Sequence, residues 1–320
     1  MLDTQVGRSY GSTDESGRLR PYWDILQQLT ELFSGFEVLA NQRYGKAYFP
    51  LARMYLGGQG IVADHQKADY YCRLAYEWCS THRSLDDPEL WNDLAEMYGN
   101  GYGTRQDLQE SLFWCRKAAD SEYAAAQYGL GLKYEYGLGV EQDVREAMAW
   151  YRKAAEQGCA SALCSLGLTY EYGYGVARNL ELASSCYRQA AEQGYAYAQI
   201  ELGVQYEFGT GVELNPALAA YWYRKSAEQG HPYAQDFLAE LYWTGLGVEQ
   251  DYDIAEFWFR QAARQGAPRA IEIVRKIYHE KMRVEAIDQQ ALYWYRKIAQ
   301  RGHLKTREFL ARYGFAWSVV

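Results

Sequence analysis

Proline and positive charge are scarce in this sequence, and each shortage bears on the class of protein. Only 6 prolines occur among 320 residues, so long stretches are free to form uninterrupted helices. Lysine and arginine number 33 against 41 aspartates and glutamates, which gives a formal net charge of −8. The basic residues form no block that could follow a phosphate backbone, so we expect no nucleic-acid partner.

The sequence also lacks the long apolar runs of membrane-spanning and secreted chains. No run of about 18 apolar residues is present to cross a bilayer. The first 21 residues are polar and lack the apolar centre of a secretory signal. These absences predict a cytoplasmic protein with no membrane span, unless a leader has been removed.

Cysteine and histidine are present in small numbers but not in metal-binding patterns. No Cys-x-x-Cys occurs, and no two of the 5 histidines stand four residues apart. We therefore predict free and mostly buried thiols, no metal site and no cofactor. The 6 cysteines are Cys72, Cys79, Cys115, Cys159, Cys164 and Cys186.

What the sequence does contain is one stretch, residues 126–158, that recurs along most of the chain. Its alanine, tyrosine and final glycine return at intervals of 36 residues. A period of this length is typical of stacked helical hairpins, which usually form binding surfaces. The recurring residues are Ala126, Ala162, Ala198, Ala234 and Ala270; Tyr134, Tyr170, Tyr206, Tyr242 and Tyr278; and Gly158, Gly194, Gly230, Gly266 and Gly302.

Two earlier copies bring the number of repeats to seven. Tyr98 lies 36 residues before Tyr134, but Tyr55 lies 43 residues before Tyr98. The difference predicts an insertion of seven residues around residues 80–89.

Each repeat reads as two helices joined by a glycine turn. In the first helix, Ala126 and Tyr134 lie on one helical face, and Gly131 inside that helix predicts close helix approach. Gly-x-Gly ends this helix, and Asp143-x-x-Glu146 resembles a capping box that opens the next. The second helix carries an apolar stripe that only a neighbouring repeat can cover.

The domain boundaries follow from this pattern. We predict a flexible tail over residues 1–21, a capping helix over 22–44, seven repeats over 45–302, and a capping helix with an apolar tail over 303–320. In the seventh copy, Lys281 and Arg283 replace the two turn glycines.

These motifs resemble the Sel-one-like repeat family, relatives of the tetratricopeptide repeats. The resemblance rests on Ala-x3-Leu-Gly-x2-Tyr at 162–170, Gly-x-Gly-Val at 173–176 and Trp-Tyr-Arg-Lys-Ala-Ala-Glu-Gln-Gly at 150–158. It implies an all-α fold, a right-handed α/α superhelical solenoid of about seven 36-residue repeats with terminal capping helices. It further implies a protein-binding scaffold or adaptor that organises a complex or a signalling assembly.

The sequence offers no nucleophile motif, and we predict that the protein is not an enzyme. A cysteine-rich branch similar to this family is associated with penicillin binding and weak β-lactamase activity. Its paired cysteines would replace residues near Ala155 and Ala162, which are alanines here. β-Lactam binding or weak hydrolysis stays open as an alternative, and so does self-assembly through the apolar tail at 313–320.

By the resemblance, the first helices line a concave groove that receives the partner. The groove residues combine aromatic rings with carboxylates, which favours a protein or peptide carrying basic and apolar anchors. The repeated Glu135, Glu171 and Glu207 are the strongest candidates, although they could also be surface residues without a role. The predicted set is Tyr128, Glu135, Glu171, Tyr197, Glu207, Tyr233, Asp236, Glu240 and Trp243.

Overall fold

The computed structural model describes residues 20–58 and 61–286, with side chains for 30–58 and 61–277. Within these ranges there are fourteen α-helices and one 3-10 helix, and no strand. The predicted all-α solenoid of repeats is therefore confirmed. The predicted C-terminal helix and tail over 303–320, and most of the predicted N-terminal tail, lie outside the described residues.

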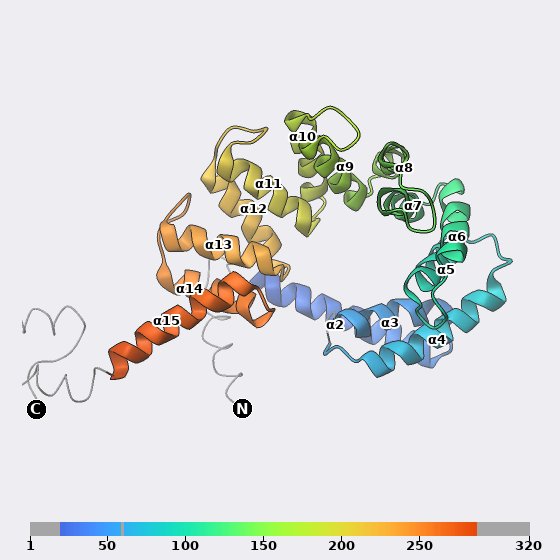
Figure 1. Cartoon of the computed structure of the whole chain (residues 1–320). Coiled ribbons are helices and arrows are strands. Elements are labelled where there is room, and N and C mark those ends of the chain that lie inside the picture. Colours follow the sequence, from blue (N-terminus) through green and yellow to red (C-terminus); the bar gives the residue numbers. More distant parts are fainter. Residues whose placement is uncertain (1–19, 59–60, 287–320) are drawn as a thin grey trace, which may run out of the picture.

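Consecutive helices pair as hairpins, and the hairpins stack into the arc seen in Figure 1. Contacts run within each hairpin and on to the next one along the chain. From α3 to α9 the first helix of each hairpin lies on the inner side of the arc (Figure 1). The pairs are α3 (Tyr48–Gly57) and α4 (His65–His82), α5 (Pro88–Asn100) and α6 (Leu108–Asp120), α7 (Ala124–Tyr136) and α8 (Val144–Glu156), α9 (Ala160–Tyr172) and α10 (Leu180–Glu192), α11 (Ala196–Phe208) and α12 (Pro216–Glu228), and α13 (Pro232–Thr244) and α14 (Tyr252–Arg264).

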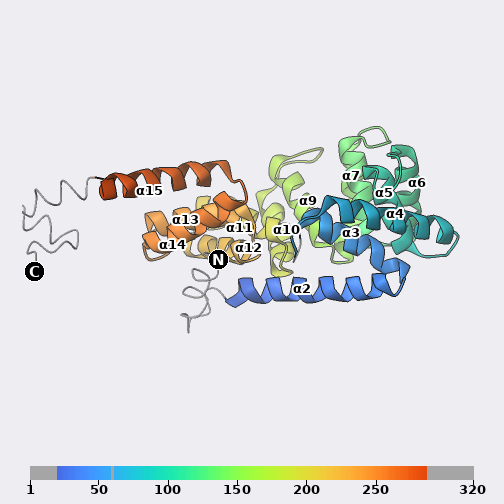
Figure 2. The ribbon, with the colours of Figure 1, turned by 90° about the horizontal axis from the view of Figure 1, so that it is seen from below.

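Two further helices flank the stack. α2 (Arg20–Asn41) precedes η1 (Gly45–Ala47) and the first hairpin, and α15 (Pro268–Ala286) follows the last one. Figure 2 shows α2 along one side of the array and α15 along the opposite side. α2 is held to the first hairpin by Phe33, whose ring meets Tyr55 edge to face at 5.4 Å.

Helices α5 to α14 share a length of 13 residues, and the longer α4 and α15 reflect two irregularities of the sequence. α4 has 18 residues, which accommodates most of the insertion near 80–89 as extra helix. α15 has 19 residues and continues through Lys281 and Arg283, where the earlier repeats turn. The earlier turns need a left-handed residue such as Gly245, with φ of 75°, and neither long side chain favours that conformation.

Helix ends in the regular repeats follow the predicted chemistry, with one correction. Gly137 ends α7 with φ of 68°, and Asp143 caps α8 by accepting from the backbone N–H groups of Arg145 at 2.9 Å and Glu146 at 3.1 Å. The Glu146 side chain was predicted to complete a capping box. Its Oε1 instead accepts the indole N–H of Trp150 at 3.1 Å, because that ring lies one turn further along the same face.

The predicted close approach of the two helices in a hairpin is confirmed. A Cβ built on Gly167 would lie 2.5 Å from Cε1 of Tyr187, and one on Gly203 would lie equally close to Tyr223. These tyrosines are fully buried. The glycines let α9 and α11 contact aromatic rings directly, which outweighs their cost to helix stability.

Glutamines connect successive hairpins in the interior. Gln199 is buried, donates through Nε2 to the carbonyl of Ala191 at 3.1 Å, and accepts from Gln229 at 2.8 Å. The same arrangement surrounds Gln127 and Gln235. Each buried glutamine side chain thereby finds partners for both its N–H and its oxygen at the boundary between two hairpins.

Candidate functional site

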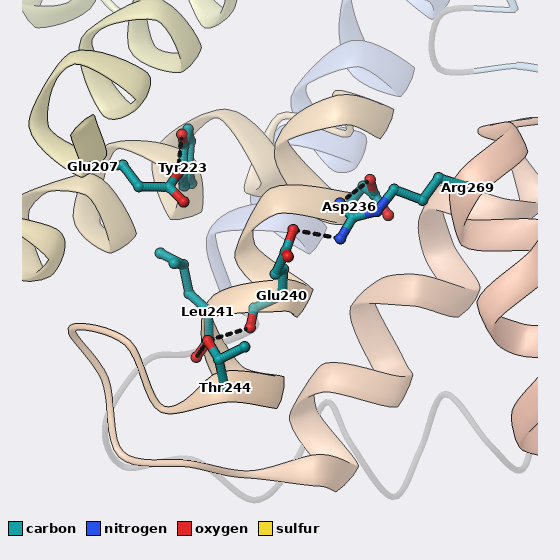
Figure 3. A network of polar contacts seen from close by, with 7 residues as sticks. All are labelled: Glu207, Tyr223, Asp236, Glu240, Leu241, Thr244 and Arg269. Atoms are coloured by element: carbon teal, nitrogen blue, oxygen red, sulfur yellow. Dashed lines mark hydrogen bonds and ion pairs between the residues drawn. The ribbon is translucent and has the colours of Figure 1, made fainter. Parts of the chain in front are cut away.

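The three repeated glutamates of the predicted groove are each bound within their own hairpin. Each carboxylate accepts a hydrogen bond from a tyrosine hydroxyl 16 residues later, in the pairs Tyr151–Glu135, Tyr187–Glu171 and Tyr223–Glu207. The O···O distance is 2.7 Å in the second and third pairs, and Figure 3 shows the third. Burial, followed by the adjacent carboxylate, raises the pKa of each of these tyrosines far above its usual value.

The tyrosine and glutamate of these pairs occur together with a third residue in the repeats of this sequence. Glycine in the first helix, glutamate four residues on, and tyrosine in the second helix occur together in three hairpins. The hairpin of α13 and α14 lacks all three, with Ala239, Trp243 and Phe259 in their places. The glutamate therefore recurs where a buried tyrosine hydroxyl needs an acceptor. This structural role could have been found from the covariation.

The half-buried carboxylates of Glu171 and Glu207 can each accept a further hydrogen bond besides the one from tyrosine. The tyrosine uses Oε2 of Glu171 and Oε2 of Glu207, so Oε1 of each is left for another donor. The bond also restricts each carboxylate to one orientation, which lowers the entropy cost of binding a cation there.

Asp236 and Glu240 are already paired with a cation of the chain. Arg269, at the start of α15, places Nη1 at 3.0 Å from Asp236 Oδ2 and Nη2 against Glu240 (Figure 3). Asp236 is 5% exposed, and burial raises its pKa despite the nearby guanidinium. Arg269 therefore already partly neutralises both predicted groove residues, while the Glu240 side chain remains 44% exposed.

The four aromatic residues of the predicted set differ in exposure. Tyr197 and Tyr233 are each 57% exposed and Trp243 is 41% exposed, so their rings are accessible to a partner. Tyr128 is half-buried, with its ring 5.6 Å from that of Tyr151, and burial raises its pKa to about 12. Less of the Tyr128 ring is available to a partner, because the ring packs against the second helix of its own hairpin.

One acidic residue on this face was missed from the sequence. Glu201 of α11 is half-buried, and burial together with Glu171 raises its pKa to about 7. Its position is occupied by Gly129 and Ser165 in the two preceding repeats, so periodicity alone did not mark it. Glu201 adds to the carboxylates between α9 and α11.

Other chemistry was sought in the same part of the chain. All 6 cysteines are free thiols, four of them buried, as predicted. No group of three metal-ligating side chains occurs among the described residues. No helix in that part is both long and apolar enough to cross a membrane.

A solenoid of stacked helical hairpins defines the class of this protein as a helical repeat protein. The Sel1 repeat model matches residues 45–77, 92–123, 124–159, 160–195, 196–231, 232–266 and 288–303. The chain belongs to the Sel1 repeat family, whose members generally serve as protein-interaction scaffolds. Comparison with curated proteins found no match.

Solved structures of the same fold agree with this assignment. A Sel1 repeat protein from Oxalobacter formigenes is 35% identical, with a TM-score of 0.59, over 66% of this chain and 85% of that one. A protective antigen of uropathogenic Escherichia coli that displays an SLR fold is 29% identical, with a TM-score of 0.56. That match covers 96% of this chain but 66% of the antigen, so the antigen extends beyond it.

Proposed function

We propose that this protein is an interaction scaffold that binds a protein or peptide segment along its concave face. The observation that carries the proposal is the row of oriented carboxylates beside exposed aromatic rings. Membership of the Sel1 repeat family supports the same function. The proposed contacts are Glu135, Glu171, Glu207, Tyr197, Tyr233 and Trp243, with Tyr128, Asp236 and Glu240 as secondary positions.

The chemistry of this face specifies the kind of segment it accepts. Oriented carboxylates favour lysine or arginine, and exposed tyrosine and tryptophan rings favour apolar or cationic side chains. Asp236 and Glu240 already hold Arg269, so the partner's basic residues are expected at Glu171 and Glu207 first. In a cell, such a scaffold would hold two or more chains in one assembly.

The proposal is tested by removing the charge of the groove without removing its hydrogen bonds. In the variant Glu135→Gln/Glu171→Gln/Glu207→Gln, each amide oxygen still accepts from its tyrosine. Affinity capture from the native cell and mass spectrometry identify a partner, whose affinity is then measured by calorimetry. We expect about tenfold or greater weakening, the effect of losing charged hydrogen bonds, with an unchanged helical circular dichroism spectrum.

A matched control removes the same charge elsewhere. Glu141, Glu213 and Glu249 are exposed residues of the turns. Changing all three to glutamine should leave the affinity nearly unchanged, since long-range charge effects are screened by salt. Equal affinity of the groove variant and the wild-type protein would refute the proposed contacts.

A further inference from the structure

A separate pocket lies near the N-terminal end of the array, between the first helices of the first three hairpins. Its volume is about 320 Å³, and its walls come from α2, η1, α3, α4, α5 and the residues around the start of α7. Four aromatic rings contribute to the lining: Phe36, Phe49, Trp78 and Tyr123. This volume is at the small end of the range for ligand pockets, roughly 300–1,000 Å³, and suits a single side chain.

The aromatic wall is held in place by close packing. Gly45 of η1 lies directly against the Trp78 indole, and any Cβ at this position would overlap the ring. The Trp78 ring also stacks on His82, with centroids 4.6 Å apart. A wall fixed in this way loses little conformational entropy when a ligand enters.

The two basic residues of the pocket already have acidic partners. Lys46 Nζ lies 2.7 Å from Asp87 Oδ2 and 3.4 Å from Glu89 Oε2. Arg53 Nη1 lies 3.6 Å from Glu96 Oε2. Lys46 therefore has no charge left for a further carboxylate in the lining, and Arg53 only partly offsets the raised pKa of that carboxylate without forming an ion pair with it.

Asp93 is that further carboxylate. It lines the pocket, and it makes no hydrogen bond or ion pair within the part of the chain that the structure describes. Burial, then the neighbouring Glu96 and Glu89, raises its pKa to about 7. A half-buried carboxylate without a hydrogen-bond or ion-pair partner is unfavourable when it is ionised, and a cation entering the pocket would relieve that cost.

We infer that this pocket binds a lysine side chain of a partner polypeptide, with the ammonium group at Asp93 and the methylene stem along the aromatic wall. Lysine combines a compact charge with an apolar stem that readily lies against such surfaces. Aromatic rings such as Trp78 attract the same cation. The site shares no residue with the groove contacts at 128–243, and it would anchor a chain on the N-terminal side of them.

The probe for the test is Nα-acetyl-lysine-methylamide. Binding is followed by the ¹⁵N–¹H signal of the Trp78 indole, which is assigned by its loss in Trp78→Phe. We expect a saturable shift in the wild-type protein and about tenfold or greater weakening in Asp93→Asn, which keeps the shape and removes the charge. The neutral Nε-acetylated probe should produce no saturable shift.

The pH dependence tests the same assignment on the unchanged protein. The probe requires ionised Asp93, whose pKa is about 7, so affinity should fall as pH decreases below that value. The other titratable groups around Asp93 are Asp87, Glu89 and Glu96 near or on α5, Lys46 on η1, Arg53 on α3, Cys79 on α4, and Tyr123 before α7. Among these, Glu96 also has a raised pKa, so it steepens the decline in the same direction.

Three results would overturn the inference: no saturable shift in the wild-type protein, equal binding of the neutral probe, or affinity independent of pH. Tighter binding of Nα-acetyl-arginine-methylamide would overturn the choice of lysine. If Asp93→Asn does not fold, the pH profile and the neutral probe decide the question. The groove variant Glu135→Gln/Glu171→Gln/Glu207→Gln should bind the probe as the wild type does, which separates this site from the groove.

Discussion

At the scale of single residues, glycine, glutamate and tyrosine depend on one another in three of the hairpins. Gly167 lets α9 approach the ring of Tyr187, and the hydroxyl at the end of that ring meets Glu171. In the hairpin of α13 and α14, Ala239 faces Phe259, which has no hydroxyl to satisfy. The glycine, the tyrosine and the glutamate that accepts from it are thus present together or absent together in these four hairpins.

Two glycines of α7 provide a direct test of this packing. A Cβ on Gly131 would overlap the Tyr151 ring, whereas one on Gly129 would make an ordinary contact at 3.5 Å with Cys115 Sγ. We expect Gly131→Ala to destabilise the protein by roughly 1–3 kcal/mol through overpacking. Gly129→Ala should stabilise it by roughly 0.5–1 kcal/mol, because alanine is the better helix former.

Both changes are measured by urea unfolding of the full-length protein. Adding Tyr151→Phe to Gly131→Ala should recover part of the lost stability, because a ring without its bond to Glu135 can shift outward. Destabilisation of equal size by both single substitutions would contradict the close-approach argument.

At the scale of helices, short local signals decide where each element begins and ends. Aspartates such as Asp107 and Asp143 accept from the free N–H groups of the following turn, and left-handed glycines end the first helices. α15 carries Lys281 at the position where the earlier first helices end in glycine, and it runs on to Ala286. The length of a helix here depends on its end residues more than on its interior.

Removing one cap tests this dependence. Asp143→Ala leaves the first N–H groups of α8 without their side-chain acceptor, and we expect a loss of about 1 kcal/mol in the free energy of unfolding. The exposed Glu141, two residues earlier, provides the control, since Glu141→Ala removes the same charge but no cap. A similar loss from both variants would point to charge, not capping, as the cause.

At the scale of the whole molecule, core clusters cross from one hairpin to the next. Met148 and Tyr151 of α8 share a buried cluster with Ala162 and Leu166 of α9. Neither hairpin can bury these side chains alone, so stability rises with the number of stacked neighbours.

Cutting the chain at this boundary should therefore expose apolar surface. A fragment of residues 1–158 loses α9, which covers Met148 and Tyr151. We expect it to bind a hydrophobic dye and to sediment as aggregates, whereas the full-length protein should do neither. A monomeric fragment that unfolds cooperatively would show that the hairpins are less dependent on one another.

Periodicity predicted the repeats well because it depends on local spacing. The 36-residue register, the hairpin units and the close approach at Gly131 all come from residues near in sequence or repeated at a constant interval. The environment of the groove residues was harder to predict. Asp236 is paired with Arg269, 33 residues away, and Tyr128 turns toward its own hairpin. Such contacts depend on how helices stack, which spacing does not specify.

The sequence by itself determined the all-α repeat class, the glycine and aspartate signals at helix ends in the regular copies and the constant 36-residue spacing after Tyr98. These features follow from helical periodicity, polar caps and glycines that tolerate a left-handed backbone. Only the tertiary structure decided that the repeated glutamates serve buried tyrosines, that α15 continues where others turn, and that Asp93 lines an aromatic pocket without an ion-pair partner among the described residues. The physical reason is that burial and pairing arise between helices, where residues distant in sequence come into contact.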